Sequence, residues 1–83
     1  RDQDWFILKL QEELGELTQV WNRYTGRGRT GEQSNEDLHK ALEDETADLL
    51  GHVLLLAHRY ELDLEEAVRR KWRFQLPSSD STH

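Results

Sequence analysis

Residues 12–21 read EELGELTQVW, and residues 45–49 read ETADL. In a helix of 3.6 residues per turn, the apolar side chains of the first stretch share one side, and Glu13 falls among them. Glu45 falls in the same way among the leucines of the second stretch. Burying an unpaired carboxylate costs several kcal/mol, so an acid at a packing position needs a reason. These stretches predict two helices that pack together and carry acids where they meet.

The apolar spacing predicts an all-α chain with three helices and no strand. Three glycines within residues 25–31 end the first helix, and Ser34 is the expected N-cap of the second, with Asn35 as the alternative. Asp63, followed three residues later by Glu66, is the expected N-cap of the third helix, which stops before Pro77. The predicted helices cover residues 2–24, 35–59 and 64–74.

The chain is short for independent folding. Its 83 residues make one domain, assigned to residues 1–76, and the Ser-rich residues 77–83 are expected to be a disordered tail. A domain of this size buries only about 60% of its unfolded surface. The second helix is apolar nearly all round, with Leu50, Leu54 and Ala57 roughly opposite its acid-bearing side. We therefore expect a bundle of three main helices per chain that is completed by homo-oligomerisation, as a dimer or a tetramer.

Charge and composition narrow the classes of partner. The formal net charge is -6, which disfavours general binding to DNA or RNA but is compatible with a phosphate ligand bridged by a metal ion. The longest apolar run, residues 53–57, is far short of the ~20 residues of a membrane span. The chain has no cysteine, which fits a reducing compartment. We expect a cytoplasmic protein with no nucleic-acid or membrane partner.

Each of the two long helices pairs an acid inside its apolar side with a second acid one turn further on. Glu16 lies about 60° from Glu13 on the first helical wheel, and Asp48 lies about 60° from Glu45 on the second. The short glycine-containing connection lets the helices pack antiparallel. Four carboxylates are therefore expected to come together.

Three explanations for these acids remain open from the residues alone. They are ordinary surface acids, or they are neutralised by Lys9 and Arg59, which lie about 40° from Glu13 and Glu45 on the wheels. Alternatively, they hold a hard divalent cation, since carboxylate oxygens are the ligands that Mg²⁺ and Mn²⁺ prefer. The third explanation accounts best for acids at packing positions.

Residues 12–16 (EELGE) followed by residues 45–48 (ETAD) resemble the EExxE…ExxD signature of the all-α nucleoside triphosphate pyrophosphohydrolases, the MazG-like superfamily. The likeness covers most of residues 5–75. It implies that residues 1–76 form a MazG-like domain. It also implies Mg²⁺-dependent hydrolysis of a (d)NTP substrate between its α and β phosphates, giving (d)NMP and pyrophosphate, as nucleotide-pool housekeeping. Mn²⁺ is expected to substitute for Mg²⁺.

The resemblance also implies roles for individual residues. Glu12 would activate the attacking water, and the metal ligands would be Glu13, Glu16, Glu45 and Asp48. Lys71 matches a lysine that many relatives place near the phosphates. The asparagine or aspartate that those relatives add after it is absent from residues 72–75, so a fifth acidic ligand is missing there.

Five further residues are candidates for substrate contact. Basic side chains suit the phosphates, a tryptophan suits a nucleobase, and a histidine beside the acids suits either metal or substrate. For each of them a structural role is the alternative: a helix C-terminus, a solvated loop, or the core. The five residues are Arg27, Arg29, Lys71, Trp21 and His52.

Two other functions stay open. One is a non-catalytic helical interaction module whose acids pair with basic residues of a partner, and which would be indifferent to Mg²⁺. The other is a phosphoribosyl-ATP pyrophosphohydrolase, which shares the signature. A carboxylate-bridged di-iron bundle needs two Glu-x-x-His motifs, and only Glu36-x-x-His39 is present.

Overall fold

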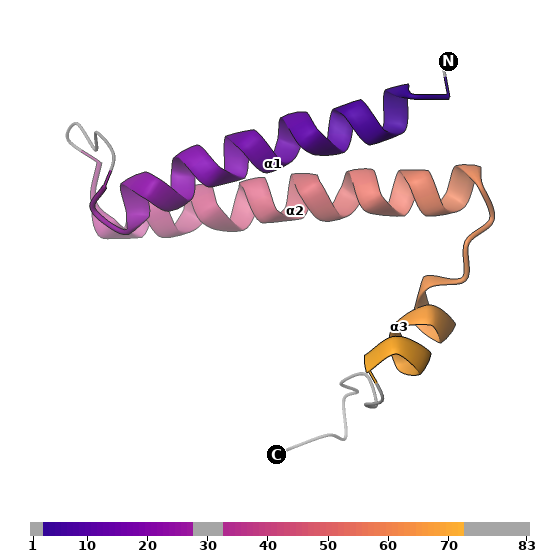
Figure 1. The fold of residues 1–83 in the computed structure, drawn as a ribbon. Helices are drawn as coiled ribbons and strands as arrows, with labels where there is room; N and C mark the ends of the chain where they lie inside the picture. The colour runs from indigo at the N-terminus through magenta and orange to yellow at the C-terminus, as the bar shows by residue number, and fades with distance from the viewer. Residues whose placement is uncertain (1–2, 28–32, 73–83) are drawn as a thin grey trace.

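The computed structural model describes residues 3–27 and 33–72, which contain three helices and no strand (Figure 1). The all-α prediction is therefore confirmed for this part of the chain. The second helix has its predicted bounds, whereas the first begins at Trp5 because residues 3 and 4 form a turn. The predicted end of the third helix at residue 74 and the tail 77–83 lie outside the described residues. The helices are α1 (Trp5–Tyr24), α2 (Asn35–Arg59) and α3 (Leu64–Trp72).

The two N-caps predicted from the sequence are present. The backbone N–H of Asp37 donates to the Ser34 hydroxyl at 3.0 Å, and the Ser34 N–H donates to the Asp37 carboxylate at 3.4 Å. This reciprocal pair is a capping box, which satisfies two of the N–H groups that a helix start leaves without partners. At α3, the N–H of Glu66 donates to the Asp63 carboxylate at 3.1 Å. Both helices therefore begin where the sequence predicts.

The two long helices end in the same backbone motif. After α1, Gly26 takes a positive φ of 82°, and the Arg27 N–H donates to the Asn22 carbonyl at 2.7 Å. This Schellman arrangement closes the last carbonyls of the helix. After α2 the same position is held by Glu61 at φ 56°. A left-handed conformation costs a non-glycine residue about 1 kcal/mol, so the junction to α3 is mildly strained.

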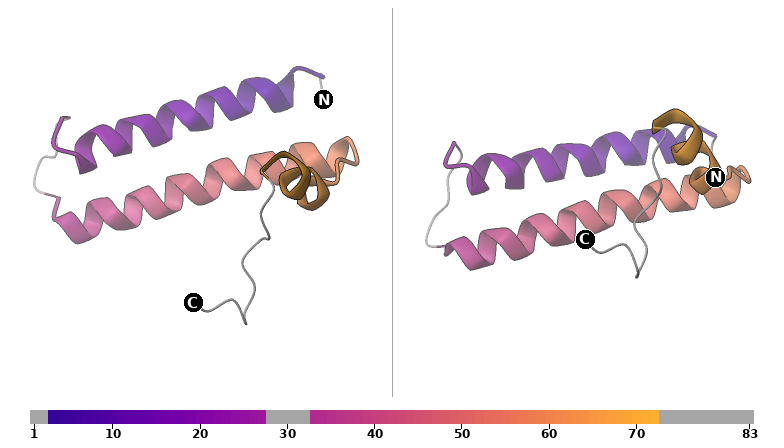
Figure 2. Two further views of the ribbon diagram at one scale, coloured as in Figure 1. Left: turned by 60° about the horizontal axis from the view of Figure 1, so that its bottom comes forward. Right: turned by 90° about the horizontal axis from the view of Figure 1, so that it is seen from below.

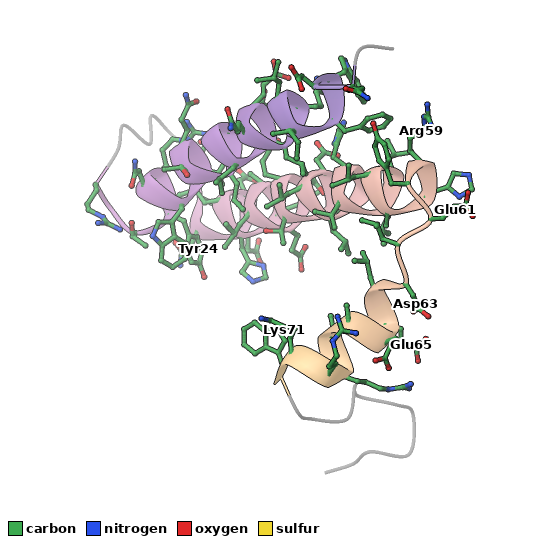
Figure 3. All side chains as sticks on the ribbon, turned by 45° about the vertical axis from the view of Figure 1, so that its right-hand side comes forward. Tyr24, Arg59, Glu61, Asp63, Glu65 and Lys71 are labelled. Atoms are coloured by element: carbon green, nitrogen blue, oxygen red, sulfur yellow. The ribbon has the colours of Figure 1, made fainter. Side chains whose placement is uncertain are left out.

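The architecture is a helical hairpin with a short third helix beside one end. α1 and α2 run antiparallel and side by side in every view, with Tyr24, the last residue of α1, at the end of the hairpin where α2 begins (Figures 1, 2 and 3). Among the described elements, only these two helices contact each other extensively. α3 follows the far end of α2 and stands off the hairpin (Figures 1 and 3). The three helices expected to form a bundle within one chain thus form a hairpin and a separate helix.

The core of the hairpin is small. Its buried apolar residues are Val20, Leu38 and Ala57, all less than 8% exposed. Leu14 and Trp21, which belong to the predicted apolar side of α1, are 52% and 45% exposed. The reason is angular: on the wheel they lie about 80–100° from Glu13, beyond the line along which α2 packs. The hairpin therefore presents large apolar side chains that the single chain leaves uncovered.

Candidate metal centre

Five acids from the two long helices meet near the middle of the hairpin. Carboxylate oxygens of Glu13, Glu45 and Asp48 all lie within 4.8 Å of one another, and so do oxygens of Glu12, Glu13 and Glu16. Glu13 belongs to both groups, so it joins the acids of α1 to those of α2. The predicted convergence of carboxylates from the two helices is therefore confirmed.

The two acids predicted at packing positions are the least accessible of the five. Glu13 is only 6% exposed and is the one buried charged residue in the described part of the chain. Glu45 is half-buried, and its Oε1 is shielded from solvent without a hydrogen-bond partner among the described residues. Each buried oxygen that lacks a partner destabilises the fold. The hairpin therefore holds carboxylates at a position where, without a ligand, they cost stability.

The electrostatics of the cluster act most strongly on Glu45. Burial raises the pKa of the Glu45 carboxyl above its ordinary value, and the nearby carboxylates of Glu16, Asp48 and Glu13 raise it further. Like charges held together favour the neutral form of the acid. Either protonation or a bound cation relieves this repulsion. A bound cation does so while the carboxylates stay ionised.

Lys9 is the only lysine or arginine that forms an ion pair with these acids within residues 3–27 and 33–72. Its Nζ lies 2.6 Å from Glu12 Oε1 and 3.8 Å from Glu13 Oε2. The hydrogen bond and charge of Lys9 lower the pKa of Glu12, and Glu12 raises the pKa of Lys9 in return. The sequence paired Lys9 with Glu13 by its i,i+4 spacing and missed the shorter i,i+3 bond to Glu12. Lys9 therefore leaves most of the negative charge of the cluster unneutralised.

Arg59, the second base considered for neutralisation, does not reach Glu45 by any ion pair found among the described residues. Its guanidinium instead lies over the Tyr60 ring, 5.4 Å from the ring centroid. Figure 3 shows Arg59 at the end of α2 beside Glu61. Among the described residues, ion pairing therefore neutralises Glu12 through Lys9, reaches Glu13 only at 3.8 Å, and leaves Glu45 without a basic partner.

His52 lies one turn beyond Asp48 and is tied to its own helix. Its Nδ1 is 2.9 Å from the Asp48 carbonyl oxygen, to which it donates when it carries the proton. Its ring centroid is 6.3 Å from that of Trp5. Neither acid group includes His52. The predicted histidine therefore lies near the cluster, positioned by the helix backbone and by an aromatic neighbour.

The other residues predicted to contact substrate lie away from the acids. Trp21 lines an apolar groove between α1 and α2. Arg27, roughly 20 Å along the α1 direction from Glu13 by helix rise, donates from Nε to the Thr25 hydroxyl at 3.2 Å. Lys71 is on α3, apart from the hairpin (Figure 3). Arg29 lies outside the described residues.

Comparisons with known proteins supply no further assignment: no family model, no curated protein and no solved structure matches this chain. Within the described residues, no helix is both long enough and apolar enough to cross a membrane. The function is therefore argued from the acids themselves.

Proposed function

We propose that this chain is a Mg²⁺-dependent nucleoside triphosphate pyrophosphohydrolase of the MazG-like type. The observation that carries the proposal is the convergence of the buried Glu13 with Glu45 and Asp48 within 4.8 Å. The EExxE…ExxD spacing of residues 12–16 and 45–48 supports it. A module that merely presents acids to a partner has no need to bury one of them at a helix contact.

The donor set fits a hard divalent cation. All the candidate ligands are carboxylate oxygens, and neither sulfur nor imidazole belongs to the two groups. Mg²⁺ takes a few carboxylates and keeps other positions for water and substrate phosphates. The Glu45 oxygen that lacks a hydrogen-bond partner is suited to such a ligand role. Mn²⁺ has the same preference for oxygen and would serve in its place.

In the proposed reaction, water attacks the α-phosphorus of a (d)NTP, and the bond from that phosphorus to the α–β bridging oxygen breaks. Pyrophosphate leaves, and the nucleoside monophosphate keeps the oxygen of the water. Glu13, Glu16, Glu45 and Asp48 would hold the metal. A divalent cation supplies neutralisation of phosphate charge and a lowered pKa for bound water.

Glu12 is proposed to orient the attacking water and to accept its proton. Its side chain is more than half exposed, beside the cluster but outside its buried part. Lys9 keeps Glu12 ionised, which is the state that can accept a proton. The lowered pKa makes Glu12 a weaker base, so a large part of its contribution would be positional. The enzyme would act on the nucleotide pool of the cytoplasm and work as a homo-oligomer.

One observation favours the interaction module as a second candidate. Of the bases predicted to bind phosphate, Arg27 and Lys71 lie away from the acids, and Arg29 lies outside the described residues. Exposed acids such as Glu16 and Asp48 are open to a basic partner. The two candidates differ in their response to metal, because a module would fold and bind alike with Mg²⁺ and without it.

The test is pyrophosphate release from canonical and modified NTPs and dNTPs and from phosphoribosyl-ATP, with Mg²⁺, with Mn²⁺ and with EDTA. We expect stoichiometric pyrophosphate and nucleoside monophosphate with either metal and none with EDTA. Release from phosphoribosyl-ATP alone would assign the narrower activity. No release from any substrate, combined with no effect of Mg²⁺ on the melting temperature, would reject the enzyme in favour of the interaction module.

A further inference from the structure

Lys9 is a cation at the edge of the acid cluster, and the reaction proposed above uses it only through Glu12. Its Nζ lies 2.6 Å from Glu12 Oε1, which is a hydrogen bond, and 3.8 Å from Glu13 Oε2, which is too long for one. A lysine ammonium has three N–H donors. Among the described residues, Lys9 therefore uses one donor and has two left for another acceptor.

The ammonium lies on the side of the hairpin from which a ligand would reach the acids. On the wheel of α1, Lys9 and Glu16 lie about 40° and 60° from Glu13 in the same direction. Asp48 lies about 60° from Glu45 in the matching direction on α2, and equal angles in an antiparallel pair fall on one side. Glu16 and Asp48 are exposed, and the side chain of Lys9 is 32% exposed. A ligand that approaches these acids from solvent therefore also meets Lys9.

The charge of the cluster calls for a cation besides the metal when a phosphate binds. Five carboxylates outnumber the positive charges of Lys9 and one divalent ion, so the site repels a triphosphate unless a base contacts it. Arg27 and Lys71 lie away from the acids. Within residues 3–27 and 33–72, Lys9 alone among the lysines and arginines forms an ion pair with them. A lysine ammonium is a common phosphate ligand in proteins.

We propose that Lys9 donates directly to a phosphate oxygen of the bound triphosphate while it keeps its hydrogen bond to Glu12. The inference rests on the proposed function, because it takes the triphosphate as a ligand of the same acids. It assigns a phosphate contact that sequence spacing does not indicate, since the i,i+3 and i,i+4 distances from Lys9 to the acids predict ion pairs only. One ammonium bonded to both Glu12 and a phosphate would also hold the proposed base beside the group that reacts.

The experiment is calorimetric titration of the full chain with inorganic tripolyphosphate in Mg²⁺. This probe carries three linked phosphates without sugar or base, so its binding does not depend on which nucleotide is the substrate. We expect Lys9→Gln to weaken its binding about 10- to 100-fold, because a hydrogen bond between charged groups is lost. Lys9→Arg keeps the charge and should recover most of the affinity. The matched control is Lys40→Gln, which removes an exposed lysine about 140° from Glu45 on the wheel and should bind like the wild type.

Titration with Mg²⁺ alone shows whether Lys9→Gln has damaged the site. Removing the ammonium leaves Glu12 and Glu13 without their basic partner, so the acids attract a cation more strongly. We expect Lys9→Gln to bind Mg²⁺ at least as tightly as the wild type, although it binds tripolyphosphate more weakly. A misfolded variant would lose both affinities.

A double variant separates direct contact from an effect that passes through Glu12. Glu12→Gln removes the ion pair and leaves Lys9 in place. If Lys9 acts only by holding Glu12, Lys9→Gln should not change tripolyphosphate binding in the Glu12→Gln background. Direct contact predicts the same 10- to 100-fold loss in that background as in the wild type.

A last measurement needs no variant. Acetylation of Lys9 in the wild type should slow several-fold when tripolyphosphate and Mg²⁺ are added together, whereas acetylation of Lys40 should not change. Acetylation of Lys9 at an unchanged rate, or a wild type that binds no tripolyphosphate, would overturn the inference. Tripolyphosphate binding that is as tight in Lys9→Gln as in the wild type would do the same, and so would a loss that disappears in Glu12→Gln.

The two proposals can fail separately. Pyrophosphate release from nucleotides by a chain whose tripolyphosphate binding ignores Lys9 would keep the hydrolase and reject the phosphate contact. Lys9-dependent binding of tripolyphosphate without release from any nucleotide would keep the contact and reject the hydrolase.

Discussion

Replacing Glu13 by Gln lowers the rate of Mg²⁺-dependent pyrophosphate release at least about 100-fold, and Glu45→Gln does the same. Each change keeps the shape of the side chain and removes one anionic ligand. Losing a group that only orients a metal ligand already reduces affinity or activity by about 10- to 100-fold, so losing the ligand itself costs more. Initial rates of pyrophosphate release at saturating Mg²⁺ measure the effect.

The melting temperature of each variant shows whether its loss of activity results from unfolding. Burial and the repulsion of neighbouring carboxylates raise the pKa of Glu45, and a neutral Gln removes the charge on which both act, so metal-free Glu45→Gln should melt no lower than the wild type. The matched control is Glu43→Gln, two residues earlier on α2, where an exposed acid lies 3.9 Å from His39 and outside the cluster. Glu43→Gln should keep full activity. Full activity in both Glu13→Gln and Glu45→Gln would remove the acids from the reaction.

Mg²⁺ at 100 times its dissociation constant should raise the melting temperature of the wild type by roughly 10–20 °C. A ligand that binds only the folded state adds about 2.7 kcal/mol at that concentration. In a domain of this size, 1 kcal/mol corresponds to about 4–8 °C. The rise follows because the cation neutralises Glu13, which has only Lys9 at 3.8 Å, and Glu45, which no ion pair reaches among the described residues. Thermal unfolding with and without Mg²⁺ measures it, and Glu45→Gln should lose most of the rise.

The response to pH gives this stabilisation a distinct signature. The folded-state pKa of Glu45 is raised above its ordinary 4.5, so between these two values the folded chain binds more protons than the unfolded chain. The free energy of unfolding of the metal-free protein therefore falls as pH rises through that window. Mg²⁺ competes with the same protons, so its effect on the melting temperature should grow as pH rises. The lowered pKa of Glu12 acts below its own ordinary value of 4.5 and does not enter this window. If the Mg²⁺-induced rise in melting temperature did not depend on pH, Mg²⁺ would be bound at another site.

Local sequence rules were sufficient to predict the helices and the position of the acids between them. Ser34 and Asp63 are N-caps because their side chains accept the N–H bonds that a helix start leaves open, and this needs no tertiary information. The burial of Glu13 follows from its wheel position alone, since whatever covers Leu17 and Val20 also covers Glu13. These features are local, and a sequence specifies them directly.

Other features depend on how the helices pack against each other, and a helical wheel of one helix carries no information about that packing. On the helical wheel, Leu14 and Trp21 lie near the side of α1 that packs against α2. Both remain about half exposed because the line of contact with α2 does not extend to them. Lys9 has Glu12 and Glu13 within reach, and the choice between them depends on side-chain conformation at the contact. The position of α3 depends on the backbone at Glu61, whose positive φ no residue-type preference indicates.

The central claim is that the carboxylates of α1 and α2 hold a divalent cation. The most direct measurement is the anomalous difference map of crystals of the full chain grown with Mn²⁺, with data collected at the manganese absorption edge. We predict a peak between Glu13, Glu45 and Asp48, about 2.0–2.2 Å from their oxygens, that is absent in crystals of Glu45→Gln. A well-ordered map with these acids free of manganese, or with manganese bound only elsewhere, would contradict the account.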